Sequence, residues 1–156
     1  MNKEKDILII RQPCDKQEYE EMYELRYKVL REPWNQPKGT EKDKLDLKDD
    51  GVYPFIALKN NDIVGTARFH RDNEHEGQIR YLAVKKEYRG QGIAKNLLDH
   101  IEWYAISLGI PYLKLNARKN VQELFEKLNY KEVAEGPTLF KKIERSVMGK
   151  QILDIM

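Results

Sequence analysis

The chain has 156 residues, enough for one domain with a hydrophobic core of its own, and we expect a single domain over residues 1–156. Its 28 basic and 26 acidic residues leave a formal charge of +2, and this near-balance argues against nucleic acid as the main partner. Cys14 is the one cysteine, which excludes an internal disulfide and favours a reducing compartment. No apolar run approaches the ~18 residues of a membrane span, and the start is too polar for a signal peptide. We therefore expect a cytoplasmic protein with no membrane partner.

The spacing of apolar residues predicts the elements in chain order. They are a strand at 7–10, a helix between 15 and 33, a loop at 32–50, strands at 53–58, 63–70 and 78–84, a helix at 93–108, a strand at 112–116, a helix at 120–128, and strands at 130–134 and 138–148. Asp15 followed by Glu18 has the pattern of a capping box, and Gly65 predicts a bulge within its strand. A crossover helix beside an antiparallel meander predicts a mixed sheet with helices on its faces.

One junction between a strand and a helix indicates a ligand. The strand ends at Val84, the helix begins at Ile93, and Arg89-Gly90-Gln91-Gly92 lies between them. Backbone N–H groups at such a helix start bind anions, and glycine lets a phosphate approach the backbone. A dinucleotide loop would need a small residue where Lys95 stands, and a nucleoside-triphosphate loop would need Gly-Lys-Ser/Thr. The remaining alternative is a turn that binds nothing.

Arg89-x-x-Gly92-x-Ala94 resembles the coenzyme A signature of the GNAT superfamily of N-acetyltransferases. The order of elements resembles the GNAT fold over nearly the whole chain. This resemblance implies an α/β (α+β) fold, with a mixed central sheet of about six to seven strands flanked by helices. The segments 115–118 and 124–130 resemble the family's second motif, a strand followed by Leu/Phe-Tyr-Glu-Lys-Leu-Gly-Phe/Tyr. Residues 25–39 resemble the amino-terminal segment of one branch of the family.

The resemblance implies an N-acetyltransferase that moves an acetyl group from acetyl-CoA to a primary amine by direct attack on the thioester. The acceptor would be a small molecule or a protein amine, and pairing of two copies through the final strands is compatible with this function. The three histidines have no metal-site spacing, so no metal is expected. The residues assigned to the cofactor are Leu82, Ala83, Val84, Arg89, Gly90, Gln91, Gly92, Ile93, Ala94, Lys95, Asn116 and Phe125.

Val84 and Asn116 are the residues expected to take part in catalysis. The backbone N–H near Val84 is the oxyanion donor that the resemblance implies. The amide of Asn116 would bond the pantetheine arm or the acceptor; a satisfied polar core residue is the alternative.

Two positions depart from the family pattern. Gln78 stands where many members carry a glutamate base, and Glu76 and His70 lie nearby in the sequence, with a surface role as the alternative for each. Phe125 stands where many members carry a tyrosine that protonates the departing thiolate. These departures favour, as alternative functions, a non-catalytic acyl-CoA-binding or regulatory module, or a protein acetyltransferase that needs a partner.

The loop at 32–50 is a second candidate region. It contains five acids (Glu41, Asp43, Asp46, Asp49 and Asp50) and three lysines after residue 40. A solvated surface segment is one interpretation. The other is a wall of the acceptor site that attracts a cationic amine, because long loops in compact domains are often functional.

Overall fold

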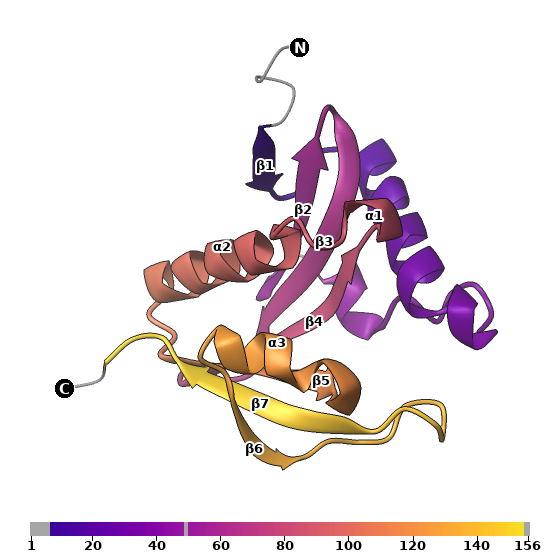
Figure 1. Cartoon of the computed structure of the whole chain (residues 1–156). Helices are drawn as coiled ribbons and strands as arrows, with labels where there is room; N and C mark the ends of the chain where they lie inside the picture. Colours follow the sequence, from indigo (N-terminus) through magenta and orange to yellow (C-terminus); the bar gives the residue numbers. More distant parts are fainter. Residues whose placement is uncertain (1–6, 49, 155–156) are drawn as a thin grey trace. The chain divides into compact units, whose positions relative to one another are not determined.

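The structure is a computed structural model, and it describes residues 7–48 and 50–154 (Figure 1). The strands are β1 (Leu8–Arg11), β2 (Val52–Lys59), β3 (Asp62–Arg71), β4 (Glu76–Val84), β5 (Tyr112–Arg118), β6 (Lys131–Glu135) and β7 (Arg145–Gln151), and the α-helices are α1 (Lys16–Leu30), α2 (Ile93–Ser107) and α3 (Gln122–Lys127). The strands form one sheet in the order β1-β2-β3-β4-β5-β7-β6. The predicted mixed sheet flanked by helices is confirmed.

The chain forms two compact units. The first contains the described residues of Met1–Phe69 together with Tyr81–Ile101, and the second contains His70–Arg80 with the described residues of Glu102–Met156. None of the helices in the described ranges is long and apolar enough to cross a membrane. A single domain over 1–156 stays a prediction.

In the first unit, α1 begins at the predicted cap. The side chain of Asp15 accepts the N–H of Glu18 at 2.8 Å. The other half of the box differs from the prediction, since the carboxylate of Glu18 accepts the N–H of Cys14 at 2.9 Å and pairs with Arg11 at 2.7 Å. The hydrogen bond from Arg11 lowers the pKa of Glu18 to about 2. The cap therefore also links β1 to α1.

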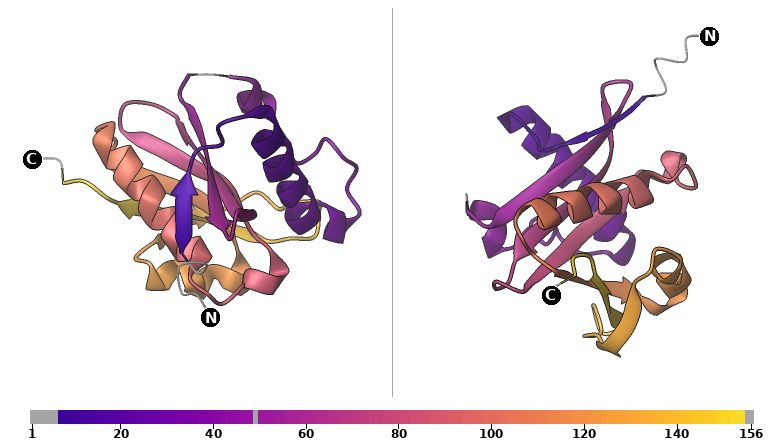
Figure 2. Two further views of the ribbon diagram at one scale, coloured as in Figure 1. Left: turned by 90° about the horizontal axis from the view of Figure 1, so that it is seen from above. Right: turned by 90° about the vertical axis from the view of Figure 1, so that its left-hand side faces the viewer.

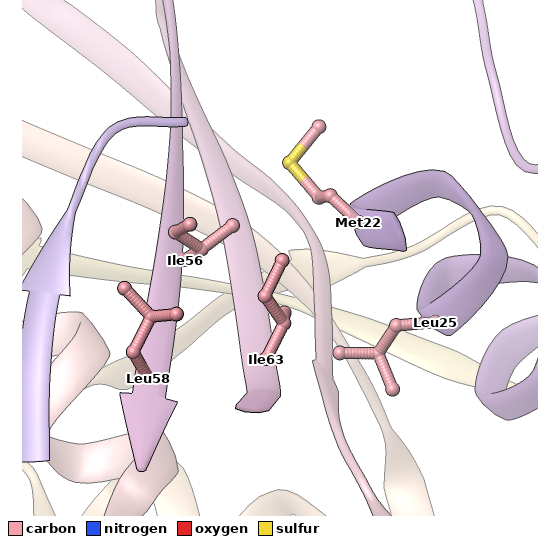
Figure 3. Packing of buried hydrophobic residues seen from close by; sticks show 5 residues of the cluster. All are labelled: Met22, Leu25, Ile56, Leu58 and Ile63. Atoms are coloured by element: carbon pink, nitrogen blue, oxygen red, sulfur yellow. The ribbon is translucent and has the colours of Figure 1, made fainter. Parts of the chain in front are cut away.

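Apolar side chains fix α1 on one face of β2 and β3. Figure 3 shows Met22 and Leu25 of α1 beside Ile56, Leu58 and Ile63, and all five are buried. Burial of such side chains is worth about 1.5–3 kcal/mol each. This packing sets the position of the loop that leaves the carboxyl end of α1.

β3 changes phase between Ile63 and Gly65. Ile63 packs with the α1 cluster, yet a Cβ atom added at Gly65 would lie 2.9 Å from Cγ2 of Ile93 in α2. Residues two apart in a regular strand share a face, so an irregularity must separate Ile63 from Gly65. α1 and the start of α2 accordingly lie on opposite faces of β2 and β3 (Figure 2). Gly65 lets α2 approach the sheet closely.

In the second unit, β5 pairs in parallel with β4 from Glu76 to Ile79, and both strands continue beyond this pairing. β7 pairs with β5 in antiparallel fashion along its whole length, and β6 pairs with β7. The predicted strand at 138–148 is wrong at its start, because Phe140 and Lys141 have φ of 53° and 58° and form a turn. β7 therefore begins at Arg145.

Candidate functional site

The segment Arg89–Ala94, here called the glycine turn, lies between β4 and α2 in the first unit. Gly90 and Gly92 have φ of +80° and +79°, which glycine adopts readily and other residues rarely do. A Cβ atom at Gly90 would meet nothing described within 4 Å, and one at Gly92 would meet only Nδ2 of Asn96, at 4.0 Å. The backbone conformation, rather than crowding, requires glycine, and the surface of the turn is open.

The glycine turn ends in a helix N-terminus. The carbonyl of Gly92 accepts the N–H of Asn96 at 3.0 Å, so the hydrogen bonding of α2 begins there. The N–H groups of Ile93 and Ala94 consequently have no acceptor within the helix. These groups and the helix dipole favour an anion, as the sequence predicted.

Among the described residues, Arg89, Lys95 and Lys59 place cations on or beside the turn. Nε of Arg89 donates to the carbonyl of Val84 at 3.4 Å, and Nζ of Lys95 lies 2.8 Å from a carboxylate oxygen of Asp99. Lys59 donates from Nζ to Oε1 of Gln91 at 2.8 Å. Sequence analysis missed Lys59, because it lies at the end of β2, 32 residues before Gln91, and no local spacing links the two.

The end of β4 presents a backbone edge. The N–H of Lys85 donates to the carbonyl of Val64 at 2.8 Å, which fixes the side that faces β3. Backbone N–H groups alternate sides along a strand, so those of Leu82 and Val84 face away from β3 while that of Ala83 faces it. The N–H of Val84 therefore points away from β3, and its role as an oxyanion donor stays a prediction.

Asn116 and Phe125 belong to the second unit. Asn116 is half-buried in β5, opposite Val147 of β7. Phe125 of α3 is 7% exposed, and its ring centroid lies 6.3 Å from that of Tyr130 in an edge contact. Asn129, which replaces the usual glycine of the second motif, has a φ of 72° after the end of α3. A left-handed residue at this place is typical of a helix C-cap.

The two nearby candidates for a base are both engaged. Nζ of Lys114 lies 2.9 Å from Oε2 of Glu76, and this hydrogen bond raises the pKa of Lys114. His70 is buried, so a surface role for it is wrong, and its Nε2 lies 3.1 Å from Oδ1 of Asp72. Glu76 fits the surface alternative that was considered for it.

The acidic loop is not an exposed acidic wall. Asp46 Oδ1 lies 3.0 Å from Nη1 of Arg26 and 3.1 Å from Nη1 of Arg68, and the Asp46 side chain is 4% exposed. Asp43 binds both terminal nitrogens of Arg68, at 2.6 and 2.9 Å. The carboxylate of Glu41, also buried, accepts the N–H of Gly39 at 2.7 Å. These acids anchor the loop and are not available to attract a cationic acceptor. Asp49 lies outside the described residues.

Asp46→Asn is therefore expected to destabilise the fold rather than to raise an acceptor KM. The change removes the carboxylate that two fully buried arginines share. Breaking a buried pair on one side costs about 3–5 kcal/mol, because a charge is left uncompensated. Urea unfolding measures the loss, with the exposed Asp50→Asn as control. Equal midpoints for the two variants would contradict the anchoring role.

Comparison with known proteins gives the class. The model of the acetyltransferase (GNAT) family matches residues 19–130. An acetyltransferase of Pectobacterium atrosepticum is 35% identical over 107 residues, which is 67% of this chain and 74% of that protein. An aminoglycoside 6'-N-acetyltransferase solved with coenzyme A has a TM-score of 0.80 at 15% identity and covers 95% of this chain and 99% of its own. The ribosomal-protein-S18-alanine N-acetyltransferase of Escherichia coli has a TM-score of 0.78 at 18% identity. The match covers 96% of this chain and 97% of that chain.

The mixed sheet of this chain, whose fourth strand leads through a glycine turn into a helix, has the fold of these solved structures. The chain belongs to the GNAT acetyltransferase family. It is an acyltransferase with acetyl-CoA as cosubstrate, which confirms the prediction of an enzyme.

Proposed function

We propose that the protein transfers the acetyl group of acetyl-CoA to a primary amine, of a small molecule or a protein, by direct attack on the thioester. The observation that carries this proposal is the open glycine turn at the start of α2, with Gly90 and Gly92 in the left-handed region. Such a turn suits the pyrophosphate of coenzyme A. The reducing compartment that Cys14 favours would be the cytoplasm.

Each part of the turn has a role in this proposal. The N–H groups from Gln91 to Ala94 bind the pyrophosphate, and Arg89 and Lys95 add positive charge. The outward edge of Leu82–Val84 pairs with the amides of the pantetheine arm, as a strand edge pairs with a peptide. Ala83, which lies between Leu82 and Val84, is buried at 2% exposure.

The chemical step uses the same edge. The lone pair of the amine attacks the carbonyl carbon, the carbonyl oxygen becomes an oxyanion, and the N–H of Val84 stabilises it. The nitrogen gives up its surplus proton to solvent, the C–S bond breaks, and the coenzyme A thiolate leaves. Asn116 is the proposed partner for the arm or the acceptor, and Phe125 stands at the motif position where many family members carry the tyrosine that protonates the thiolate.

Initial rates of coenzyme A release, measured with a panel of primary amines, test the proposal. We expect release above the buffer rate with at least one primary amine and none with matched tertiary amines, which cannot give a stable amide. Release that does not depend on any amine would indicate thioester hydrolysis and contradict the proposed acceptor.

We further propose that Lys59 contacts the phosphates of coenzyme A. Its Nζ is held at the turn by an amide oxygen of Gln91 and lies 6.0 Å from the ring centroid of Tyr88. Within the described ranges Lys59 has no carboxylate partner, so its charge is uncompensated. A phosphate oxygen would take the place of the Gln91 oxygen.

Lys59→Gln is expected to weaken acetyl-CoA binding about five-fold, because one exposed charge pair at 4 Å contributes about 1 kcal/mol in water. Calorimetric titration measures it. Lys85→Gln is the matched control, since Lys85 already pairs with Asp62 at 2.9 Å. Repeating both titrations with dephospho-CoA locates the contact. A Lys59 effect that persists assigns it to the pyrophosphate, and one that disappears assigns it to the 3'-phosphate. Equal Kd values for the Lys59 and Lys85 variants would remove Lys59 from the site.

A further inference from the structure

Three arginines, here called the arginine cluster, surround the ring of Tyr81 inside the first unit. The guanidinium carbons of Arg26, Arg68 and Arg31 lie 4.5, 5.0 and 5.7 Å from its ring centroid. A positive charge within about 6 Å of an aromatic centroid is attracted to the ring. Tyr81 is 8% exposed, and Arg26 and Arg68 are fully buried. The ring is therefore held from several sides.

The arginine cluster is charged. Burial lowers the pKa of Arg68, but the hydrogen bond with Asp43 and the charges of Asp46 and Asp43 outweigh burial and raise the pKa. Within the described residues, Nε and Nη2 of Arg26 and Nε of Arg68 have no hydrogen-bond partner. Buried charges with unsatisfied donors cost free energy, and apolar side chains of similar volume often stabilise a core equally well. The cluster thus points to a purpose other than stability.

Tyr81 has an unusual backbone for a residue within a strand. Its φ is +56°, a region in which a bulky side chain is a genuine outlier. Such a residue persists only where its surroundings hold it. Tyr81 directly precedes Leu82–Val84, so its conformation sets the direction in which the N–H groups of this edge point.

We propose that Arg26 and Arg68 are positioning residues, which hold the ring of Tyr81 and thereby orient the edge Leu82–Val84 for acetyl transfer. The acids of the 43–46 segment fix the two arginines by ion pairs. The ion pairs and the ring contacts of the two arginines thus connect the loop after α1 to the cofactor edge of β4. The inference rests on the proposed function, since the edge matters only if it binds the cofactor.

Substitutions at Tyr81 test this inference through an order of activities. Tyr81→Phe keeps the ring and is expected to retain the kcat and the acetyl-CoA Kd of the wild type within about two-fold. Tyr81→Asn loses the ring, but asparagine tolerates the left-handed backbone. Tyr81→Leu has no ring, and leucine does not tolerate the left-handed backbone. We expect kcat per folded molecule to fall in the order Phe, Asn, Leu, with Leu about 10- to 100-fold below wild type, because a misplacement of about 1 Å can cost about 100-fold. Apolar burial alone would place Leu above Asn.

Arg26→Met supplies the second arm. Combined with Tyr81→Leu, it is expected to add little further loss of kcat, because the arginine acts through the ring. Leu25→Ala, at a buried neighbour on α1, is the control that lowers the melting temperature without changing kcat per folded molecule. Leu at or above Asn in activity, or fully additive losses, would overturn the inference. The acetyl-CoA Kd values give the same order without any acceptor, so they decide even if no amine is turned over.

Discussion

Replacing Gly92 with aspartate is expected to weaken acetyl-CoA binding between about five-fold and nearly a thousand-fold. The new carboxylate would lie roughly 4 Å from the pyrophosphate, where like charges repel by about 1 kcal/mol in water and about 4 kcal/mol near a protein surface. A tenfold change in affinity corresponds to about 1.4 kcal/mol. Calorimetric titration of the folded variant with acetyl-CoA measures the loss.

Gly92→Asn is the matched control for this charge. Asparagine has nearly the size of aspartate and tolerates the left-handed region, where Gly92 lies with a φ of +79°. A Cβ atom at this position meets only Nδ2 of Asn96, at 4.0 Å, so it adds little steric cost. The asparagine variant should bind acetyl-CoA far better than the aspartate variant. If the two bind equally well, the pyrophosphate does not lie at the glycine turn.

Replacing Phe125 with tyrosine is expected to raise kcat at neutral pH, with little change in the Kd for acetyl-CoA. General-acid assistance is typically worth about 10²–10⁴-fold when the assisted step limits the rate. The pKa of a free thiol is about 8.5, so the thiolate leaves without an acid and the wild type should still turn over. The gain should be largest below that pH and shrink above it.

The alternative results for Phe125→Tyr are also informative. Phe125 is buried, so unfolding of the variant must first be excluded by its melting temperature. A stable variant with the kcat of the wild type would show that amine attack or product release limits the rate. A variant with reduced acetyl-CoA affinity would contradict the expectation that the hydroxyl is accommodated beside the thiol. Phe125→Leu is the control for loss of the ring.

Local sequence patterns predicted most elements of the fold. The cap at Asp15, the meander of three strands and the helix from Ile93 all follow from residues within a few positions of each other. The predicted start of the last strand was wrong, because two non-glycine residues, Phe140 and Lys141, take left-handed conformations in the turn before β7. No local preference of phenylalanine or lysine predicts such a turn.

The candidate site also contains residues that the local sequence predicts and residues that only the fold brings together. The glycine turn was predictable, since the signature and the helix start are contiguous. Lys59 could not be found, because only the pairing of distant strands brings it to Gln91. The ion pairs of Asp43 and Asp46 could not be predicted either, since their partners Arg26 and Arg68 come from α1 and β3. The sequence of a polar loop suggests solvated charges, and only the fold shows that distant arginines pair with them.

The most direct test of amine acetylation is the joint measurement of coenzyme A and acetylated amine in one reaction of the wild-type protein. Acetyl-CoA is mixed with a primary amine that supports release, and both products are quantified by mass spectrometry over time. We predict one N-acetylated amine for each coenzyme A released, and no acetylated protein when the amine is left out, since the amine attacks the thioester directly. Coenzyme A released without acetylated amine, or a protein that binds acetyl-CoA and acetylates no small or protein amine, would contradict the proposed function.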